Sequence, residues 1–197
     1  MKLKQTPSQT IGPFFSYGLA PDQYAYKQMA SAAGPELAAD DTAGEHIRLV
    51  GRVFDGKGDP VSDALIEIWQ ADAAGRHRRT ADDRAGNNPF TGFGRCGTGT
   101  DPQNRFVFRT VKPGAAPEDG APHVNLIVFM RGLLQHVYTR AYFSDEAEAN
   151  AADAVLQSVP EDRRGTLVAE RQETPDGIVY RFDIHMQGER ETVFFDV

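Results

Sequence analysis

Apolar residues recur at every second position in several short segments of this chain, which is the spacing of a half-buried β-strand. In residues 178–186, for example, Ile178, Tyr180 and Phe182 share one face, and polar side chains share the other. Turns rich in glycine, proline and aspartate separate the segments. The expected strands cover residues 47–54, 64–71, 105–111, 123–130, 137–143, 167–171, 178–186 and 192–195. Short strands at this spacing predict a mainly β, single-domain sandwich.

One segment has the pattern of a short helix. Asp145 is suited to cap its first turn, with Glu148 three residues later as the capping-box partner. An apolar stripe follows and ends before Pro160; it consists of Ala152, Val155, Leu156 and Val159. We expect this helix to pack against one edge of a sheet.

Residues 1–46 show only weak periodicity. They begin with an aromatic-containing stretch and continue into an alanine-rich acidic run. We therefore expect an extended N-terminal arm and connector over residues 1–46, followed by the sandwich over residues 47–197. The aromatic content of the arm favours docking on a surface over free movement.

Composition narrows the function classes. The 197 residues carry 21 basic and 28 acidic side chains, a net charge of −7, which argues against a nucleic-acid or anionic-membrane surface. The single cysteine excludes an intrachain disulfide, and no apolar stretch approaches the roughly 18 residues of a membrane span. The opening Met-Lys-Leu-Lys lacks the apolar centre of a signal peptide, so we expect a cytoplasmic protein.

His123 and Asn125 form the most informative pair. They lie two residues apart in an expected strand, so their side chains share a face. A His-x-His pair in that position would aim two imidazoles at one point. An amide is a poor substitute for imidazole at a transition metal. The strand therefore has the pattern of a metal site that has lost a ligand.

Other chemically capable residues have simpler explanations. The basic cluster at residues 76–79 is more consistent with surface ion pairs than with a phosphate site in so acidic a chain. Asp82 and Asp83 are adjacent and do not converge as a catalytic pair would. Cys96 has no sequence cue for a nucleophilic triad. Trp69 is best explained by core or interface packing, and His185 by a solvated strand face.

Several longer segments resemble the intradiol ring-cleaving dioxygenases. The resemblance extends over nearly the whole chain and rests on specific motifs: Thr6-Pro-Ser-Gln-Thr-Ile-Gly-Pro13, Leu65-Ile-Glu-Ile-Trp-Gln-Ala-Asp72, Lys112-Pro-Gly114, the segment from His123 to Gly132, the segment from Arg140 to Asn150, and the terminal segment from Tyr180 to Asp196. It implies a β-sandwich of the intradiol dioxygenase type.

Members of that family hold a non-haem Fe(III) with two tyrosines and two histidines. The resemblance matches these four ligand positions to Ala85, Ala116, His123 and Asn125 of this chain, and a nearby catalytic arginine to Gly120. Alanine cannot ligate a metal, and a lone imidazole cannot hold Fe(III). We expect no metal site on this chain.

The resemblance implies a division of labour between two kinds of subunit. An alpha subunit without iron pairs with a beta subunit that holds the Fe(III), in a larger oligomer. Together they use O2 to cleave 3,4-dihydroxybenzoate to 3-carboxy-cis,cis-muconate. The alpha residues that help to form the substrate pocket match Arg131, Thr10, Gly12 and Pro13. We expect Arg131 to pair with a carboxylate and the arm residues to shape a pocket wall.

Two alternatives stay open. A self-sufficient iron enzyme is disfavoured by the residues at positions 85, 116 and 125. A transthyretin-like β-sandwich that serves only as a binding or structural module would need none of the substrate residues. Without the resemblance, Arg131 would be explained as a solvated residue at a strand end, and His123 as a core or interface histidine.

Overall fold

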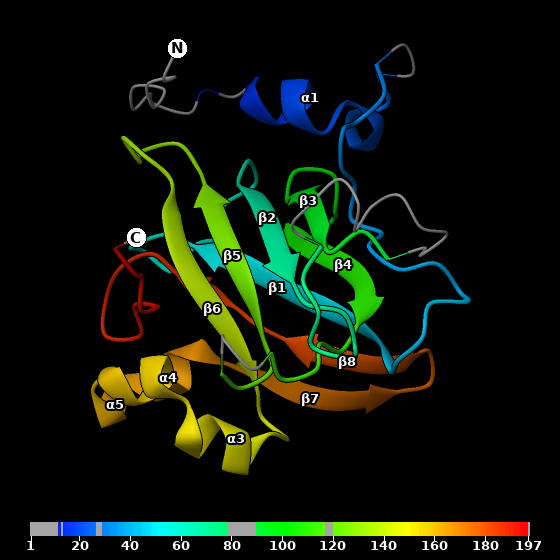
Figure 1. Ribbon diagram of the computed structural model, residues 1–197. Coiled ribbons are helices and arrows are strands. Elements are labelled where there is room, and N and C mark those ends of the chain that lie inside the picture. Colours follow the sequence, from blue (N-terminus) through cyan, green and yellow to red (C-terminus); the bar gives the residue numbers. More distant parts are fainter. Residues whose placement is uncertain (1–11, 13, 27–28, 79–89, 117–119, 197) are drawn as a thin grey trace, which may run out of the picture.

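Strands of this chain form two layers that face one another and are joined along one edge (Figure 1). The computed structural model describes residues 12, 14–26, 29–78, 90–116 and 120–196. The strands in these ranges are β1 (His46–Phe54), β2 (Leu65–Gln70), β3 (Phe93–Gly97), β4 (Arg105–Val111), β5 (His123–Phe129), β6 (Val137–Phe143), β7 (Val168–Thr174), β8 (Gly177–Arg181) and β9 (Ile184–His185).

Hydrogen bonding follows the order β3-β2-β5-β6-β7-β8-β1-β4. The first four strands are antiparallel to their neighbours and form one layer. A short parallel pairing of Tyr142 and Phe143 with Val168 and Ala169 joins β6 to β7 and leads into the second layer. There β1 pairs with β4 in antiparallel and with β8 in parallel orientation. The predicted mainly β sandwich is confirmed.

The core lies between the layers and follows the alternation along each strand. On β1, Ile47, Leu49 and Val53 point inward, and on β5 the inward residues are Val124, Leu126 and Val128. Phe106 and Phe108 of β4 are fully buried among them. Burying a side chain of this size contributes roughly 1.5–3 kcal/mol. A second, smaller cluster lies beneath the helices and consists of Ala121, Tyr142, Leu156, Val159 and Leu167.

The strand predictions differ from the structure in three places. β3 was not predicted, because its two glycines resemble turn residues. A Cβ on Gly94 would lie 2.4 Å from the Leu37 side chain, so glycine there leaves room for the N-terminal segment. The expected strand 178–186 is interrupted at residues 182–183, where the Asp183 carboxylate accepts a hydrogen bond from the Arg52 backbone N–H. Residues 192–195 form only an isolated bridge, between Phe195 and Tyr138.

The single expected helix is in fact a series of short ones: α3 (Ala147–Ala152), α4 (Ala154–Ser158), α5 (Glu161–Arg164) and η2 (Gly165–Leu167). The prediction was wrong about the cap. Asp153 has an extended backbone, ends α3, and accepts a hydrogen bond from the Leu156 N–H at the start of α4. Asp145 instead binds Lys112, the residue that follows β4. A capping aspartate inside the apolar stripe therefore splits the helix.

The N-terminal arm is not wholly extended. Its described part contains the helix α1 (Phe15–Leu19) and the 3-10 helix η1 (Pro21–Tyr24). These lie across one end of the β2 and β5 layer, whereas α3, α4 and α5 lie near the other end (Figure 1). No helix in the described ranges is both long and apolar enough to cross a membrane.

Candidate functional site

The outward face of β5 carries the metal-like pattern. Val124, Leu126 and Val128 fill the core, which places His123 and Asn125 on the opposite face of the strand. Asn125 stands directly opposite Trp69 of β2 on one side and Arg140 of β6 on the other.

Trp69 anchors a further ring beside this row. The His77 ring stacks on Trp69 with 6.0 Å between the ring centroids and an interplanar angle of 2°. His77 belongs to the basic cluster 76–79, within which Arg76 forms the expected surface ion pair, with Asp72 at 2.8 Å. Trp69 therefore packs against His77 at the outer surface of the sheet and not in its core.

His123 lies at the beginning of β5 and is 6% exposed. Its Nδ1 lies 2.8 Å from the carbonyl oxygen of Ala121, and its ring packs against that of Tyr142. A backbone carbonyl accepts hydrogen bonds, so this contact fixes the protonated Nδ1 tautomer and the orientation of the ring.

Asp153 organises the space next to His123. Its carboxylate accepts hydrogen bonds from the Tyr142 hydroxyl at 3.0 Å, the Ala121 N–H at 2.9 Å and the Leu156 N–H at 2.7 Å. Burial alone would raise the pKa of Asp153, but these hydrogen bonds outweigh it and leave the pKa below its usual value. Burial, together with the neighbouring carboxylate, raises the pKa of Tyr142 to about 12.

Gly120 lies against the same carboxylate. A Cβ built on Gly120 would stand 2.2 Å from an Asp153 oxygen, and the backbone there has a φ of +88°. No side chain fits at position 120 while Asp153 keeps its partners. The arginine that the resemblance places at this position is therefore excluded by the local structure.

The remaining ligand-equivalent positions offer no donor set for iron. Ala116 forms an isolated bridge with Gly120 and presents only a methyl group. Ala85 lies outside the described residues. Across the described ranges, no group of three or more histidine, cysteine, aspartate or glutamate side chains could hold a metal ion. One imidazole beside an amide and a methyl group does not fit Fe(III), which needs a fuller shell of hard ligands.

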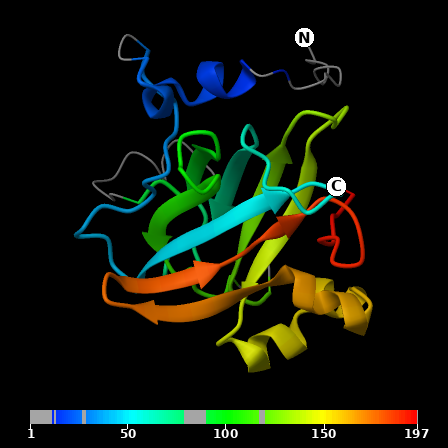
Figure 2. The same cartoon turned by 180° about the vertical axis from the view of Figure 1, so that it is seen from behind.

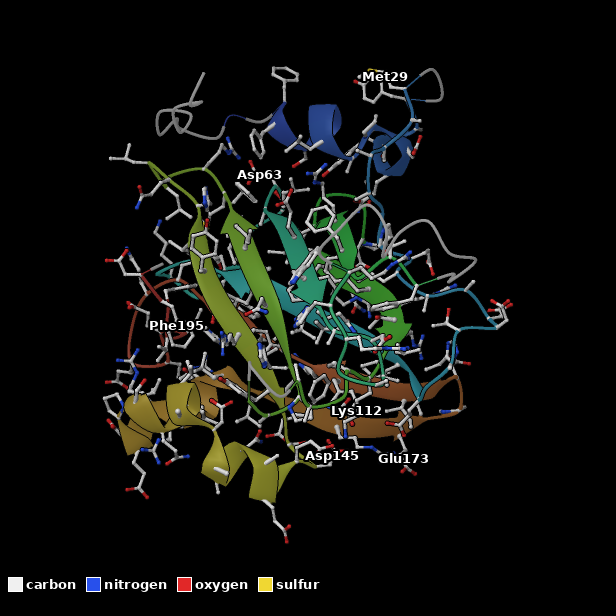
Figure 3. All side chains as sticks on the ribbon, in the orientation of Figure 1. Met29, Asp63, Lys112, Asp145, Glu173 and Phe195 are labelled. Carbon is white, nitrogen blue, oxygen red and sulfur yellow. The ribbon has the colours of Figure 1, made fainter. Side chains whose placement is uncertain are left out.

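Arg131 lies at the other end of β5, just beyond its last residue. Its side chain is 59% exposed, and its Nε contacts the carboxylate of Asp63 in the segment that precedes β2. Figure 3 labels Asp63 at this end of the sheet, below α1. The ion pair leaves much of the guanidinium accessible from outside the chain.

The arm lies at the same end. The Phe15 ring packs on Phe129 with 5.5 Å between centroids, two residues before Arg131. Gly12 precedes it and accepts a hydrogen bond from the Phe15 N–H. Gly12 is exposed, and a Cβ there would meet nothing within 4 Å. Thr10 and Pro13 lie outside the described residues.

Polar contacts hold the arm in place. The Gln23 side chain bridges the backbone of Gly97, donating to its carbonyl at 2.6 Å and accepting from its N–H at 2.8 Å. Arg95 of β3 donates to the Leu19 carbonyl. These bonds hold α1 and η1, the described helices of the arm, on β3.

The two groups of expected site residues are far apart. His123 is the first residue of the seven-residue strand β5 and Arg131 lies just beyond its last; the strand spans about 20 Å at roughly 3.3 Å per residue. Both cannot contact one small molecule. Arg131 and Gly12 therefore do not line the degenerate position of their own chain and instead face outward at the opposite end.

Sequence reasoning missed Asp153 and Asp63. The signal for Asp153 was present, because an aspartate three residues before Leu156 matches an N-cap, but the apolar stripe outweighed it. No local pattern marks Asp63 as a partner of Arg131. Cys96 is a free and buried cysteine. Burial raises the pKa of its thiol, which leaves it a poor nucleophile and agrees with the lack of a sequence cue for a triad.

Comparisons with known proteins agree on one family. The family model described as Dioxygenase matches residues 20–188. The chain is 59% identical to a protocatechuate 3,4-dioxygenase alpha chain of Burkholderia cepacia, covering 99% of this chain and 98% of that one. It is 33% identical to the beta chain of the same enzyme and organism, covering 87% and 80%.

A solved structure supports the fold. The dioxygenase domain of a carbohydrate-binding fusion protein from a Streptomyces species superposes with a TM-score of 0.60 at 22% identity, covering 96% of this chain and all of that one. Since both the family model and the curated relatives span most of the sequence, the chain belongs to the intradiol ring-cleavage dioxygenase family.

Proposed function

We propose that this chain is the iron-free alpha subunit of a protocatechuate 3,4-dioxygenase. The enzyme cleaves 3,4-dihydroxybenzoate with O2, between its two hydroxylated carbons, to give 3-carboxy-cis,cis-muconate. The Fe(III) that the family generally uses would be held by the beta subunit. This chain would contribute part of the substrate pocket and none of the metal ligands.

The observation that carries the proposal is the 59% identity to an alpha chain over almost the full length of both proteins. Local geometry supports it independently. The space beside His123 is occupied by Asp153 and has no room for a side chain at position 120. Arg131 and Gly12 meanwhile lie at the opposite end of the sheet, with exposed surface for a second chain to cover.

Arg131 would bind the substrate through its carboxylate. A guanidinium presents paired N–H donors that match the two oxygens of a carboxylate, and its charge is retained at any physiological pH. Asp63 acts as a positioning residue, because its contact with Nε leaves the terminal nitrogens of Arg131 to face outward. Binding here fixes the ring in one orientation, so that its two hydroxyl groups lie toward the partner.

The arm would complete the wall of the pocket. Gly12 has no packing contact that requires glycine within the described part of this chain, so a small residue there fits close approach of a ligand or of a partner chain. We propose that Thr10 supplies a hydroxyl donor to the pocket and that Pro13 restricts the direction of the backbone in the same segment. The hydrogen bonds of Gln23 to β3 supply a rigid base for this segment.

Alpha and beta chains are both named among the relatives, which implies an alpha-beta hetero-oligomer. We propose that the beta subunit is the obligatory partner, that no nucleic acid or membrane is bound, and that the assembly is cytoplasmic. The acidic net charge of −7 supports the second of these statements, because it disfavours a nucleic-acid or anionic-membrane surface. We propose residues 1–46 as arm and connector and residues 47–197 as the sandwich. A transthyretin-like module without a substrate role is disfavoured, since it gives no reason for an outward Arg131 held by Asp63.

Co-expression with a beta subunit tests the proposal. We expect the chain purified alone to contain no stoichiometric iron and to consume no O2 with 3,4-dihydroxybenzoate. The co-purified pair should contain iron, absorb visible light as a ferric protein and consume one O2 per substrate. Metal analysis and an oxygen electrode measure both results. Stoichiometric iron with turnover in the isolated chain would contradict the proposal, and a pair that forms without activity would favour the structural module.

Replacing Arg131 with alanine should raise KM for 3,4-dihydroxybenzoate about ten- to hundredfold, because a charge-assisted hydrogen-bonded pair contributes roughly 1.5–3 kcal/mol. Iron content of the assembled enzyme should stay unchanged. Asp63→Asn should raise KM less, and Arg131→Lys should restore part of the loss. Arg109→Ala is the matched control, since Arg109 is exposed and forms a weak ion pair on the other layer. Unchanged steady-state kinetics in Arg131→Ala would remove this residue from the pocket.

A further inference from the structure

The outer face of the second layer carries an unusual set of cations for so acidic a chain. Figure 2 shows this layer from behind, with β1, β7 and β8 toward the viewer and no helix across them. Four arginines from three strands line one cleft on this face. They are Arg48 and Arg52 of β1, Arg105 of β4 and Arg181 of β8. Alternation along β1 forces its two arginines outward, because Leu49 and Val53 occupy the core.

Like charges face each other across β1 and β4. Arg52 stands directly opposite Arg105, and Arg48 directly opposite Arg109. Cross-strand pairs of the same sign destabilise a sheet unless a counter-charge lies between them. Asp101 supplies one for Arg105, with contacts of 3.0 Å to Nε and 2.9 Å to Nη2.

Arg181 is also paired, but the two arginines of β1 are not compensated in the same way. Asp183 accepts hydrogen bonds from Nε and Nη2 of Arg181. Within the described part of the chain, no carboxylate binds the guanidinium of Arg52. Arg48 donates a hydrogen bond to the Thr174 hydroxyl at 3.3 Å. Its ion pair with Asp176 is long, at 4.0 Å, and the Asp176 side chain is 82% exposed.

Each of these arginines has an Nε–H donor for which the described part of the chain offers no acceptor. The Nε atoms of Arg48 and Arg52 are shielded from solvent, and among the described residues neither has an acceptor. A buried donor without a partner costs roughly 1–3 kcal/mol, and more when it belongs to a charged group. An anion that entered the cleft would bring acceptor oxygens to this pair of guanidinium groups.

The cleft has the size and lining for a small organic anion. Its volume is about 300 Å³, at the lower end of the range for small-molecule sites. Val50 and Val179 are among its lining residues, and both occupy outward positions on neighbouring strands. Gln103 and Gln172 add neutral amide groups. Even with Asp176 and Asp183 counted, the lining residues carry an excess of positive charge. Guanidinium groups above an apolar floor suit a flat carbon skeleton that bears several carboxylates.

We propose that this cleft is a binding site for a small, flat organic polycarboxylate, held chiefly by Arg48 and Arg52. It is separate from the residues expected to line the substrate pocket, which lie on the other layer and its arm. The tricarboxylate product of ring cleavage is one ligand of this class, and that identification alone rests on the proposed function.

Binding to the full-length chain tests the site. The probes are trans-aconitate, a flat tricarboxylate unrelated to the reaction, then 3-carboxymuconate, inorganic phosphate and benzoate, all at low salt because screening weakens such contacts. Titration calorimetry should show saturable binding of both tricarboxylates, at least tenfold tighter than phosphate or benzoate. Addition of trans-aconitate should shift the Nε–H NMR signals of Arg48 and Arg52. Arg52→Gln and Arg48→Gln should each weaken binding at least fivefold, whereas Arg109→Gln, with the same charge change outside the cleft, should not.

Several results would overturn the site, and one would change only the identity of its ligand. Absence of saturable binding, equal binding of phosphate, or equal loss in Arg109→Gln would show that no specific polycarboxylate site exists. Self-association through this face, detected by sedimentation and abolished by Arg52→Gln, would assign the cleft to an interface between copies. Binding of trans-aconitate without 3-carboxymuconate would keep the site and exclude the product as its ligand. Arg52→Lys, which keeps the charge and loses the paired donors, covers the case in which the glutamine variant does not fold.

Discussion

Replacing Gly120 with arginine is expected to lower the free energy of unfolding by more than about 3 kcal/mol, because two penalties act together. The backbone has a φ of +88°, which residues with a side chain rarely adopt. The new Cβ would also stand 2.2 Å from the Asp153 carboxylate. Asp153 cannot move aside cheaply, because it caps α4 and binds the Tyr142 hydroxyl and the Ala121 N–H. Denaturant titration measures the loss.

Gly177→Arg separates the two penalties. Its φ of +107° is similarly unfavourable, but a Cβ there would meet nothing within 4 Å. We expect this variant to lose only the backbone part, roughly 1–2 kcal/mol. Equal losses at the two glycines would show that Asp153 gives way, and would contradict the view that it excludes a side chain at position 120.

The same packing explains why restoring ligands should fail. Tyrosine at position 116 and histidine at position 125 would supply two donors, but the carboxylate of Asp153 would still leave no room for an arginine at position 120. New ligands alone would therefore not make an iron site here, because Asp153 already occupies the space next to Gly120 and Ala121. Sequence comparison at the ligand positions alone gives no sign of this.

Strands could be predicted from the sequence where apolar and polar residues alternate. The expected segments 105–111 and 137–143 coincide with β4 and β6, since each buries one face against the opposite layer. β3 could not be found in this way, because Gly94 and Gly97 are required by contacts with Leu37 and Tyr24, which are distant in sequence. The alternation of polar and apolar residues does not predict a strand where contacts with residues distant in sequence require glycine.

The candidate site was likewise predictable only where a local pattern determines the structure. His123 and Asn125 were correctly placed on one face, because that follows from the two-residue period of a strand. The alternation along the strand does not say how far this pair lies from Arg131, which belongs to the same segment of the resemblance. In the structure its ends lie about 20 Å apart, and only the Arg131 end adjoins the arm. The sequence alone does not predict which end of β5 the N-terminal arm covers.

Lys112 illustrates how a motif residue can have a structural role. It precedes the Pro-Gly turn quoted as part of the family resemblance, and its side chain is only 14% exposed. Its ammonium group binds Asp145 at 2.8 Å and Glu146 at 2.6 Å, and lies over the rings of Phe143 and Tyr180. Figure 3 labels Lys112 and Asp145 together at the end of the sheet remote from Asp63. This cluster joins β4 to the segment between β6 and α3.

The cluster also sets the protonation of its members. Burial alone would raise the pKa of Asp145, but hydrogen bonds from Lys112 and Tyr180 outweigh it and lower the pKa below its usual value. Burial, with the Asp145 contact, raises the pKa of the Tyr180 hydroxyl to about 12. A lowered carboxyl pKa contributes stability that is present above the ordinary pKa of 3.8 and is lost as the pH falls through the lowered value.

Lys112→Met should therefore cost about 2–4 kcal/mol at neutral pH, because it leaves two carboxylates near a largely buried position without their cation. The deficit relative to the wild-type chain should shrink as the pH falls from 3.8 through the lowered pKa of Asp145, because the carboxylate is then protonated and the native pair is lost as well. Lys57→Met, which removes an exposed lysine, should change stability by less than about 0.5 kcal/mol at every pH. Urea unfolding curves between pH 3 and 8 measure both variants. A deficit for Lys112→Met that stays constant down to pH 3 would mean that its packing on Phe143 and Tyr180, and not its charge, stabilises this junction.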